Sequence, residues 1–160
     1  MTHRLDPLFN PKGVVVAGAS THPGKCGFVT LHNLLAGGFE GPVFATNRDG
    51  ADVLGRPTLR SVAEVPEGEA DLVVVCTPKG SVPEVLTQAA DRGVRAAFLT
   101  TAGYGEAGDA GRAEQAELVA LAERLGLVIA GPNGQGVIST PAKLCAQIVA
   151  PNPPPGSIGV

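Results

Sequence analysis

The sequence predicts an α/β fold: a Rossmann-like, doubly wound and mainly parallel sheet with helices on both faces. Short apolar runs of strand length alternate along the chain with segments whose apolar residues recur at helical spacing. The short runs are apolar at successive positions, which is typical of strands that are buried on both faces. The 22 glycines and 14 prolines are spread between these runs, where they indicate turns.

Five short runs that are rich in β-branched residues are the predicted strands. They cover residues 13–18, 42–46, 71–77, 95–101 and 127–131. Because helical segments separate them, the strands are expected to be parallel and joined by right-handed crossovers. In such sheets a ligand binds outside the carboxyl ends of the strands, where the strand order reverses. The loops that follow the strands are therefore the places to look for a site.

Helices are predicted between the strands, over residues 25–36, 81–93 and 109–125. The second begins with Ser81 and Glu84, which have the spacing of a capping box, and it has Pro83 in its first turn. The third places leucines on one face and ends before Gly126. Residues 61–66 are predicted to form a single turn that Pro66 ends.

The chain has 160 residues, enough for one domain with its own core, predicted over residues 1–150. Residues 151–160 are expected to be a proline-rich linker followed by the opening of another strand, "SIGV". Such a strand buries little without chain after it. We therefore expect the chain to be the front piece of a longer protein.

Charge and composition exclude several classes of partner. Twelve basic and fifteen acidic residues give a net charge of −3, which argues against nucleic-acid binding. The N-terminus has no apolar signal core, and no apolar run approaches the ~18 residues of a membrane span. Three cysteines without metal-like spacing are typical of reduced thiols. We expect a cytoplasmic protein with no membrane partner and no metal site.

The stretch "VVVAGASTHPGKCGF" leads from the first strand into a glycine-containing loop that is suited to phosphate. Backbone amides of the loop after Gly18 and the N-terminus of the next helix can bind a diphosphate. Ser20 and Thr21 supply hydroxyls, and Lys25 supplies a positive charge. The alternative is a glycine-rich turn that only packs the helix on the sheet.

Two phosphate-binding motifs fit this loop poorly. A P-loop needs Ser or Thr after Gly-Lys as a Mg²⁺ ligand, whereas Cys26 stands there. The dinucleotide pattern G-x-G-x-x-G fails because Ala19 and Ser20 follow Gly18. At the end of the second strand Asp49 is a candidate partner for a ribose diol, but the neighbouring Arg48 suits a ribose phosphate better. NAD(P) stays an alternative, and coenzyme A fits better, since it has a diphosphate and a ribose phosphate.

Five segments, in order, carry a family resemblance: "LFNPKGVVVAGAST", "LLAGGFEGPVFATN", "DLVVVCTPKGSVPEVL", "AAFLTTAGYGE" and "GPNGQGVIST". Together they resemble the N-terminal CoA-binding domain of NDP-forming acyl-CoA synthetases. That superfamily includes the succinyl-CoA synthetase α subunit, ADP-forming acetyl-CoA synthetases and multidomain protein acetyltransferases. The resemblance covers residues 6–151 and implies that the chain binds coenzyme A.

The resemblance also implies a binding site, block by block. The loop around the CoA diphosphate corresponds to Gly18, Ala19, Ser20 and Thr21, beside Lys25. The adenosine and its 3′-phosphate correspond to Thr46, Asn47 and Arg48, and the nucleotide side to Thr77 and Pro78. The pantetheine arm is implied to pass Thr101, Ala102 and Gly103 and to end near Asn133. This sequence departs from the family pattern at Gly134, where Cys or Ser is common, and at Thr46-Asn47-Arg48, where the family commonly has V-N-P.

The resemblance implies that this segment binds CoA and contains no catalytic residue. In the family a phosphohistidine on a flavodoxin-like ligase domain, with an ATP-grasp domain or β subunit, forms the acyl phosphate that receives the CoA thiol. No histidine here lies in a segment like that one. We interpret Glu106 as a solvated loop carboxylate, and Tyr104 either as a cover for pantetheine or as packing. The alternatives are an NAD(P)-binding module and a stand-alone regulatory CoA-binding protein; a homo-oligomer is compatible with all three.

Overall fold

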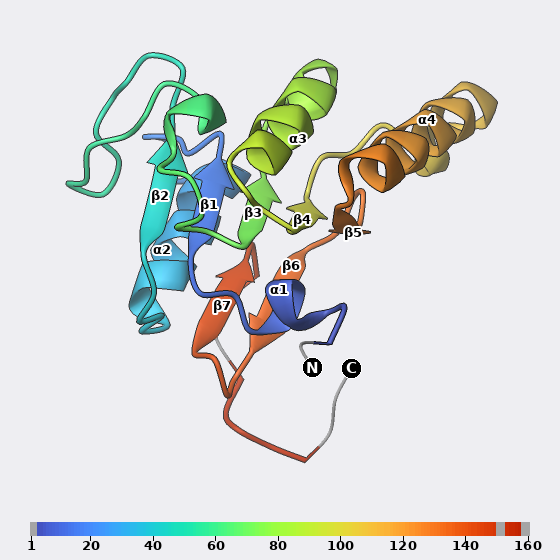
Figure 1. Ribbon diagram of the computed structural model, residues 1–160. Helices are drawn as coiled ribbons and strands as arrows, with labels where there is room; N and C mark the ends of the chain where they lie inside the picture. The colour runs from blue at the N-terminus through green and yellow to red at the C-terminus, as the bar shows by residue number, and fades with distance from the viewer. Residues whose placement is uncertain (1–2, 150–152, 158–160) are drawn as a thin grey trace.

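The computed structural model describes residues 3–149 and 153–157 of the chain (Figure 1). Most of the predicted strand opening "SIGV" and part of the proline-rich segment lie outside these residues. Residues 153–157 have no helix or strand. Within the described ranges, none of the helices is long and apolar enough to cross a membrane.

Five parallel strands form the central sheet, as predicted: β1 (Val14–Ala17), β2 (Val43–Thr46), β3 (Leu72–Val75), β4 (Ala96–Leu99) and β5 (Val128–Ala130). Their order is β2-β1-β3-β4-β5. The strands lie side by side with their first residues in register, Val14 opposite both Val43 and Leu72. The arrowheads of β1, β2 and β3 point the same way in Figure 1. The strand order reverses between β1 and β3, so a ligand is expected at that point.

Helices cover both faces of the sheet. The predicted helices are α2 (Cys26–Ala36), α3 (Val82–Asp91) and α4 (Asp109–Leu125), with bounds within two residues of those expected. The predicted single turn is the 3₁₀ helix η1 (Val62–Glu64). Gly126 ends α4 in the left-handed conformation, with φ of 69°, as a C-cap glycine does. Three short helices of the described residues were not predicted: α1 (Asp6–Phe9) and the 3₁₀ helices η2 (Lys79–Ser81) and η3 (Gly105–Ala107).

The predicted capping box at the start of α3 is wrong. Ser81 makes no side-chain cap hydrogen bond, and the Glu84 carboxylate instead accepts one from Gln88 Nε2 at 2.9 Å. A 3₁₀ turn, η2 (Lys79–Ser81), runs directly into the helix. It leaves Ser81 with φ of −94° and ψ of −11°, whereas a capping serine needs an extended backbone.

A β-hairpin follows the sheet and was not predicted either. Its strands β6 (Gly136–Ser139) and β7 (Leu144–Gln147) pair antiparallel. The hairpin packs on α2, where Asn33 Nδ2 donates to the Gln147 carbonyl at 3.0 Å. Together, the hairpin and α2 therefore cover one face of the sheet.

Alternate residues of each strand enter two cores. Val15, Val73 and Leu99 lie in the core beneath α3 and α4. Val14 and Val74 lie in the other core, beneath α2 and the hairpin. All five are fully buried, as expected for strands that are apolar at successive positions.

Candidate functional site

A cleft of about 420 Å³ opens at the point where the strand order reverses. It lies between the loops that follow β1, β2 and β3 and the start of α3. Five of the predicted site residues line it: Gly18, Thr46, Arg48, Thr77 and Pro78. Residues from three separate predicted blocks thus meet in one place.

Gly18 allows the backbone to turn sharply at the bottom of this cleft. Its φ is 87°, and an added Cβ would lie 2.9 Å from Thr77 Cγ2 and 3.0 Å from the Cys76 carbonyl. Its N–H donates to Thr46 Oγ1 at 3.2 Å, and the Ala19 N–H donates to the Thr46 carbonyl at 2.8 Å. These two bonds fix the loop after β1 to the end of β2. Because Gly18 has no side chain, a ligand in the cleft can approach its backbone closely.

Helix α2 begins against the same loop. A Cβ added to Gly27 would lie 2.0 Å from the Gly18 carbonyl oxygen, so only glycine permits this close approach. Lys25 is the N-cap residue of α2 and is exposed. In the loop after β1 and the first turn of α2, the described structure gives no hydrogen-bond partner to the N–H groups of four residues: Ser20, Thr21, Cys26 and Gly27. Such a group of free N–H donors at a helix N-terminus favours an anion.

Asn47 holds the loops after β1 and β2 together. Its Nδ2 donates to the Ala19 carbonyl at 2.9 Å, and its Oδ1 accepts the N–H of Asp49 at 3.0 Å. Both ends of the amide are therefore engaged within the protein. The neighbouring Arg48 side chain is exposed at the cleft.

Hydroxyl groups follow the ends of β3 and β4. Thr77 Oγ1 is buried and has no hydrogen-bond partner in the described structure. Thr101 Oγ1 donates to the Thr77 carbonyl at 2.8 Å, which ties the two strand ends together. Beside them, burial raises the pKa of the Cys76 thiol to about 11, so this group stays protonated and unreactive at neutral pH.

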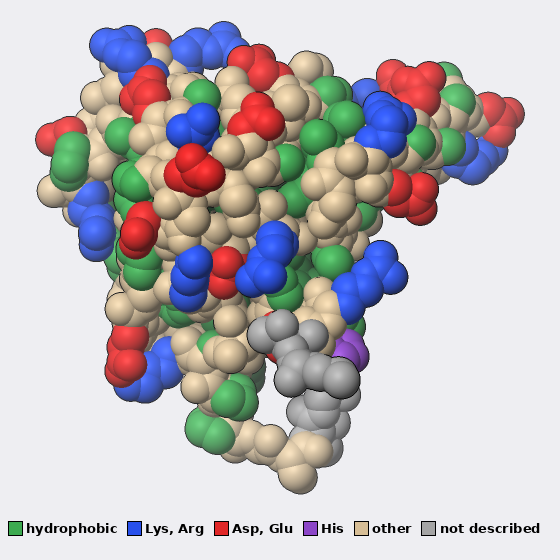
Figure 2. Space-filling model, viewed as in Figure 1, with side chains coloured by type: hydrophobic (Ala, Val, Ile, Leu, Met, Phe, Trp, Pro, Cys, Tyr) green, Lys and Arg blue, Asp and Glu red, His purple; other side chains and the backbone are tan. Residues whose placement is uncertain are grey.

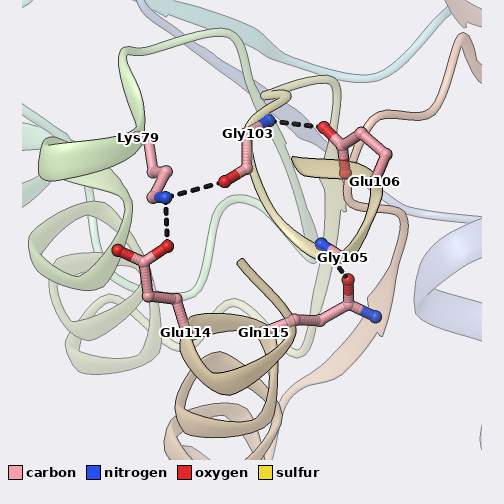
Figure 3. A network of polar contacts seen from close by, with 6 residues as sticks. All are labelled: Lys79, Gly103, Gly105, Glu106, Glu114 and Gln115. Atoms are coloured by element: carbon pink, nitrogen blue, oxygen red, sulfur yellow. Dashed lines mark hydrogen bonds and ion pairs between the residues drawn. The ribbon is translucent and has the colours of Figure 1, made fainter. Parts of the chain in front are cut away.

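The loop after β4 is held by a network of polar contacts (Figure 3). Lys79 Nζ donates to the Gly103 carbonyl at 2.7 Å, forms an ion pair with Glu114, and lies 5.3 Å from the ring centroid of Tyr104. The Glu106 carboxylate accepts the Gly103 N–H, and this bond is the main cause that lowers its pKa. Glu106 is thus an exposed, ionised carboxylate that fixes a turn, in line with the interpretation as a solvated group.

Tyr104 is buried, with 3% of its surface exposed, in the core beneath α4. Burial raises the pKa of its hydroxyl. Of the two interpretations offered for this residue, packing is the one that agrees with its position.

Asn133 lies on the loop after β5. Its φ is 55°, and its N–H donates to the Thr101 carbonyl at 2.9 Å. The departure from the family pattern at the next residue has a physical reason here, because a Cβ at Gly134 would lie 2.5 Å from Cζ of Phe98. The aromatic ring takes the space that a Cys or Ser side chain needs.

The predicted site residues therefore fall into two neighbouring groups at one edge of the sheet. The first group lines the cleft, lies in the loop before α2 or, as Asn47 does, joins the loops after β1 and β2. The second group lies on the loops after β4 and β5 and does not line the cleft: Thr101, Ala102, Gly103 and Asn133. A backbone bond from Asn133 to Thr101 connects the loops of this second group.

Sequence reasoning missed two basic residues at this edge, Arg60 and Lys79. Arg60 lines the cleft from a long loop that has no periodic pattern to indicate where it lies. Lys79 comes directly after Thr77 and Pro78 at the end of β3, and that position was a usable signal. Among the residues the structure describes, no cluster of three or more His, Cys, Asp or Glu side chains is arranged to hold a metal ion.

A protein-family model described as a CoA binding domain matches residues 12–140. Among curated relatives, the alpha subunits of ADP-forming acetate–CoA ligases I and II of Pyrococcus furiosus are 38% and 39% identical to this chain. The alignments cover 98% and 91% of this chain and 34% and 31% of the relatives. The chain thus spans about a third of the length of these relatives.

Solved structures with a similar fold are related to the same group of proteins. A crystal structure of a Pyrococcus horikoshii OT3 protein matches with a TM-score of 0.85 and 37% identity, over 91% of this chain and 33% of that one. The dinucleotide-forming acetyl-coenzyme A synthetase 1 of Ca. Korarchaeum cryptofilum, in complex with phosphate and ADP, matches with a TM-score of 0.84 and 35% identity. That match covers 90% of this chain and 30% of the synthetase.

Proposed function

The chain belongs to the family of CoA-binding domains, and we propose that it serves as the CoA-binding segment of an NDP-forming acyl-CoA synthetase. Coenzyme A is the ligand of this family. The ligase assignment draws on the relatives, which are named as ADP-forming acetate–CoA ligase subunits. The parent activity would be that of an acid–thiol ligase of the cytoplasm.

The single observation that carries the proposal is the pairing of two features at the reversal point of the sheet. One is the group of free N–H donors around Ser20 and the start of α2, which suits a diphosphate. The other is the cleft beside it, which is lined by Arg48 and by Thr77, whose buried hydroxyl has no partner in the described structure. A ligand with a diphosphate and a further ribose phosphate uses both features.

The residues present fit coenzyme A as follows. Gly18, Ser20 and Thr21, with Lys25, would hold the diphosphate through backbone N–H groups, hydroxyls and a positive charge. The cleft at Thr46, Arg48, Thr77 and Pro78 would hold the adenosine part, with Asn47 fixing its wall. The loops at Thr101, Ala102, Gly103 and Asn133 would guide the pantetheine arm.

When bound, coenzyme A supplies the thiol that attacks an acyl phosphate. The proposed role of this segment is to orient that thiol, since fixing two reactants together contributes up to ~7–11 kcal/mol to lowering a barrier. The acyl phosphate would form on partners outside this segment: a flavodoxin-like ligase domain with a phosphohistidine and an ATP-grasp domain or β subunit. Alone, the segment should bind CoA without catalysing a reaction.

Calorimetric titration with CoA, NAD⁺ and ATP–Mg²⁺ tests the proposal. We expect saturable binding of CoA at one site and neither of the other ligands at comparable affinity. The variant Gly18→Ala should abolish CoA binding, because its Cβ would lie 2.9 Å from Thr77 Cγ2 and the loop after β1 would have to move. Binding of NAD⁺ in preference to CoA would refute the proposal and favour the alternative NAD(P)-binding module.

A further inference from the structure

The loop of residues 47–61 brings two arginines to the same cleft. It leaves the end of β2, at the upper left of Figure 1, and returns to it. The return is fixed by two backbone bonds, from the Asn47 N–H to the Leu59 carbonyl at 2.8 Å and from the Leu59 N–H to the Ala45 carbonyl at 2.9 Å. Arg48 at the start of the loop and Arg60 at its end therefore line one wall of the cleft.

The two arginines are also linked directly. Arg60 Nη1 donates to the Arg48 carbonyl at 3.4 Å, and its guanidinium carbon lies 3.6 Å from the position of a Cβ at Gly50. Gly50 has φ of 68°, and its lack of a side chain leaves room for this guanidinium. Figure 2 shows basic side chains over this part of the molecule, above the end of β2.

Neither arginine is paired with a carboxylate within 4.0 Å among the described residues. The Glu64 carboxylate accepts the backbone N–H of Arg60 at 3.2 Å, and Glu84 on the opposite wall accepts a bond from Gln88. Two like charges held at one cleft repel each other, and an anion between them relieves this repulsion.

We infer that Arg60, together with Arg48, binds the 3′-phosphate on the ribose of coenzyme A. This inference rests on the proposed function. The free N–H donors before α2 suit the diphosphate of CoA. The remaining phosphate of CoA, on its ribose, is therefore assigned to the wall of the cleft where Arg48 and Arg60 lie. One guanidinium can donate two parallel hydrogen bonds to two oxygens of a phosphate. A terminal phosphate has three such oxygens, so a second arginine is needed to contact all of them. Arg60 is thus a specificity-determining residue that separates CoA from dephospho-CoA.

The test is calorimetric titration of the 160-residue chain and its variants with CoA and dephospho-CoA. For Arg60→Gln we expect CoA affinity to fall roughly tenfold to a hundredfold, the loss typical of hydrogen bonds to a charged group. Affinity for dephospho-CoA should stay within about twofold of the unchanged chain, because that ligand lacks the phosphate that Arg60 contacts. Arg60→Lys, which keeps the charge, should recover part of the preference for CoA.

Arg56→Gln is the matched control. Arg56 is an exposed arginine on the same loop that does not line the cleft. This variant should bind both ligands as the unchanged chain does, and thermal melting should show that all variants are folded.

Three results would overturn the inference. If Arg60→Gln keeps its preference for CoA, or loses affinity for both ligands equally, Arg60 does not bind the 3′-phosphate. The proposed function is unaffected by either result. An equal effect of Arg56→Gln shows that only the net charge of the loop matters. If the unchanged chain binds neither ligand, the proposed function itself fails, and the role of Arg60 fails with it.

Discussion

Replacing Gly27 by alanine tests the close approach of α2 to the loop after β1. The added Cβ would lie 2.0 Å from the Gly18 carbonyl oxygen and 3.0 Å from Ala19 Cα, whereas ordinary contact begins at 3.4 Å. Both neighbours are backbone atoms that hydrogen bonds to Thr46 hold in place. The start of α2 must therefore move away from the loop.

The expected size of the effect is a balance of two terms. Alanine in place of glycine favours a helix by up to about 1 kcal/mol, less near the end of a helix. Forcing an extra methyl group into a packed contact costs typically ~1–3 kcal/mol. The cost of the packed contact is the larger of the two here, because the backbone atoms of Gly18 and Ala19 cannot rotate away as a side chain can. The free energy of unfolding should therefore fall by roughly 1–2 kcal/mol. In a chain of this size that lowers the melting temperature by a few degrees, at about 2–4 °C per kcal/mol.

Ligand binding should suffer as well, since the free N–H groups at the start of α2 move with the helix. We expect CoA affinity to fall about tenfold, which corresponds to ~1.4 kcal/mol. Thermal denaturation and calorimetry measure the two effects. Gly80→Ala is the control, because a Cβ there meets nothing within 4 Å and its φ lies outside the left-handed region. A Gly27→Ala variant as stable and as tightly binding as Gly80→Ala would refute the reasoning.

Four more variants or treatments have defined outcomes. Asn47→Ala removes a donor and an acceptor that join two loops, so denaturant titration should show a loss of about 1–2 kcal/mol, and Asn47→Asp should recover part of it. At a mildly alkaline pH iodoacetamide should label the exposed Cys26 well before Cys76, as read by mass spectrometry of the peptides. Since the pKa of Cys76 is raised on folding, the stability that its protonated thiol contributes should be lost as the pH rises from about 9 to about 11. Lys79→Met should weaken binding of CoA and dephospho-CoA equally and speed hydrogen exchange in the loop after β4; an effect on CoA alone would contradict the assigned role.

The strands of the sheet were predictable because each is a run of buried residues that the sequence shows locally. A run such as Leu72–Val75 is recognised without knowledge of its distant partners, and the rule that ligands lie at the strand ends then selects Gly18, Thr46 and Thr77. The capping box failed for a local reason of a different kind. The 3₁₀ turn before α3 begins after Pro78 and includes Gly80, which the spacing of Ser81 and Glu84 does not take into account.

The hairpin and Arg60 were not predictable in this way. Strands β6 and β7 are not continuous apolar runs, since Gly136, Ser139 and Gln147 lie at their ends. The face that they cover is defined by a distant contact, from Asn33 to Gln147. Arg60 reaches the cleft because Asn47 and Leu59 pair across the loop, and neither residue type indicates such a pairing. Both features depend on contacts between segments that no local pattern connects.

The hairpin also has a consequence for how the chain folds. The bond from Asn33 to Gln147 joins residues 114 positions apart, so the face of the sheet beneath α2 closes only after almost the whole domain has been synthesised. Until then Val14, Val16 and Val74 lack the cover of Leu144 and Ala146. Closing so long a loop is slow compared with forming local helices. A nascent chain that ends at β5 therefore still exposes part of this apolar face, and the completed hairpin covers it.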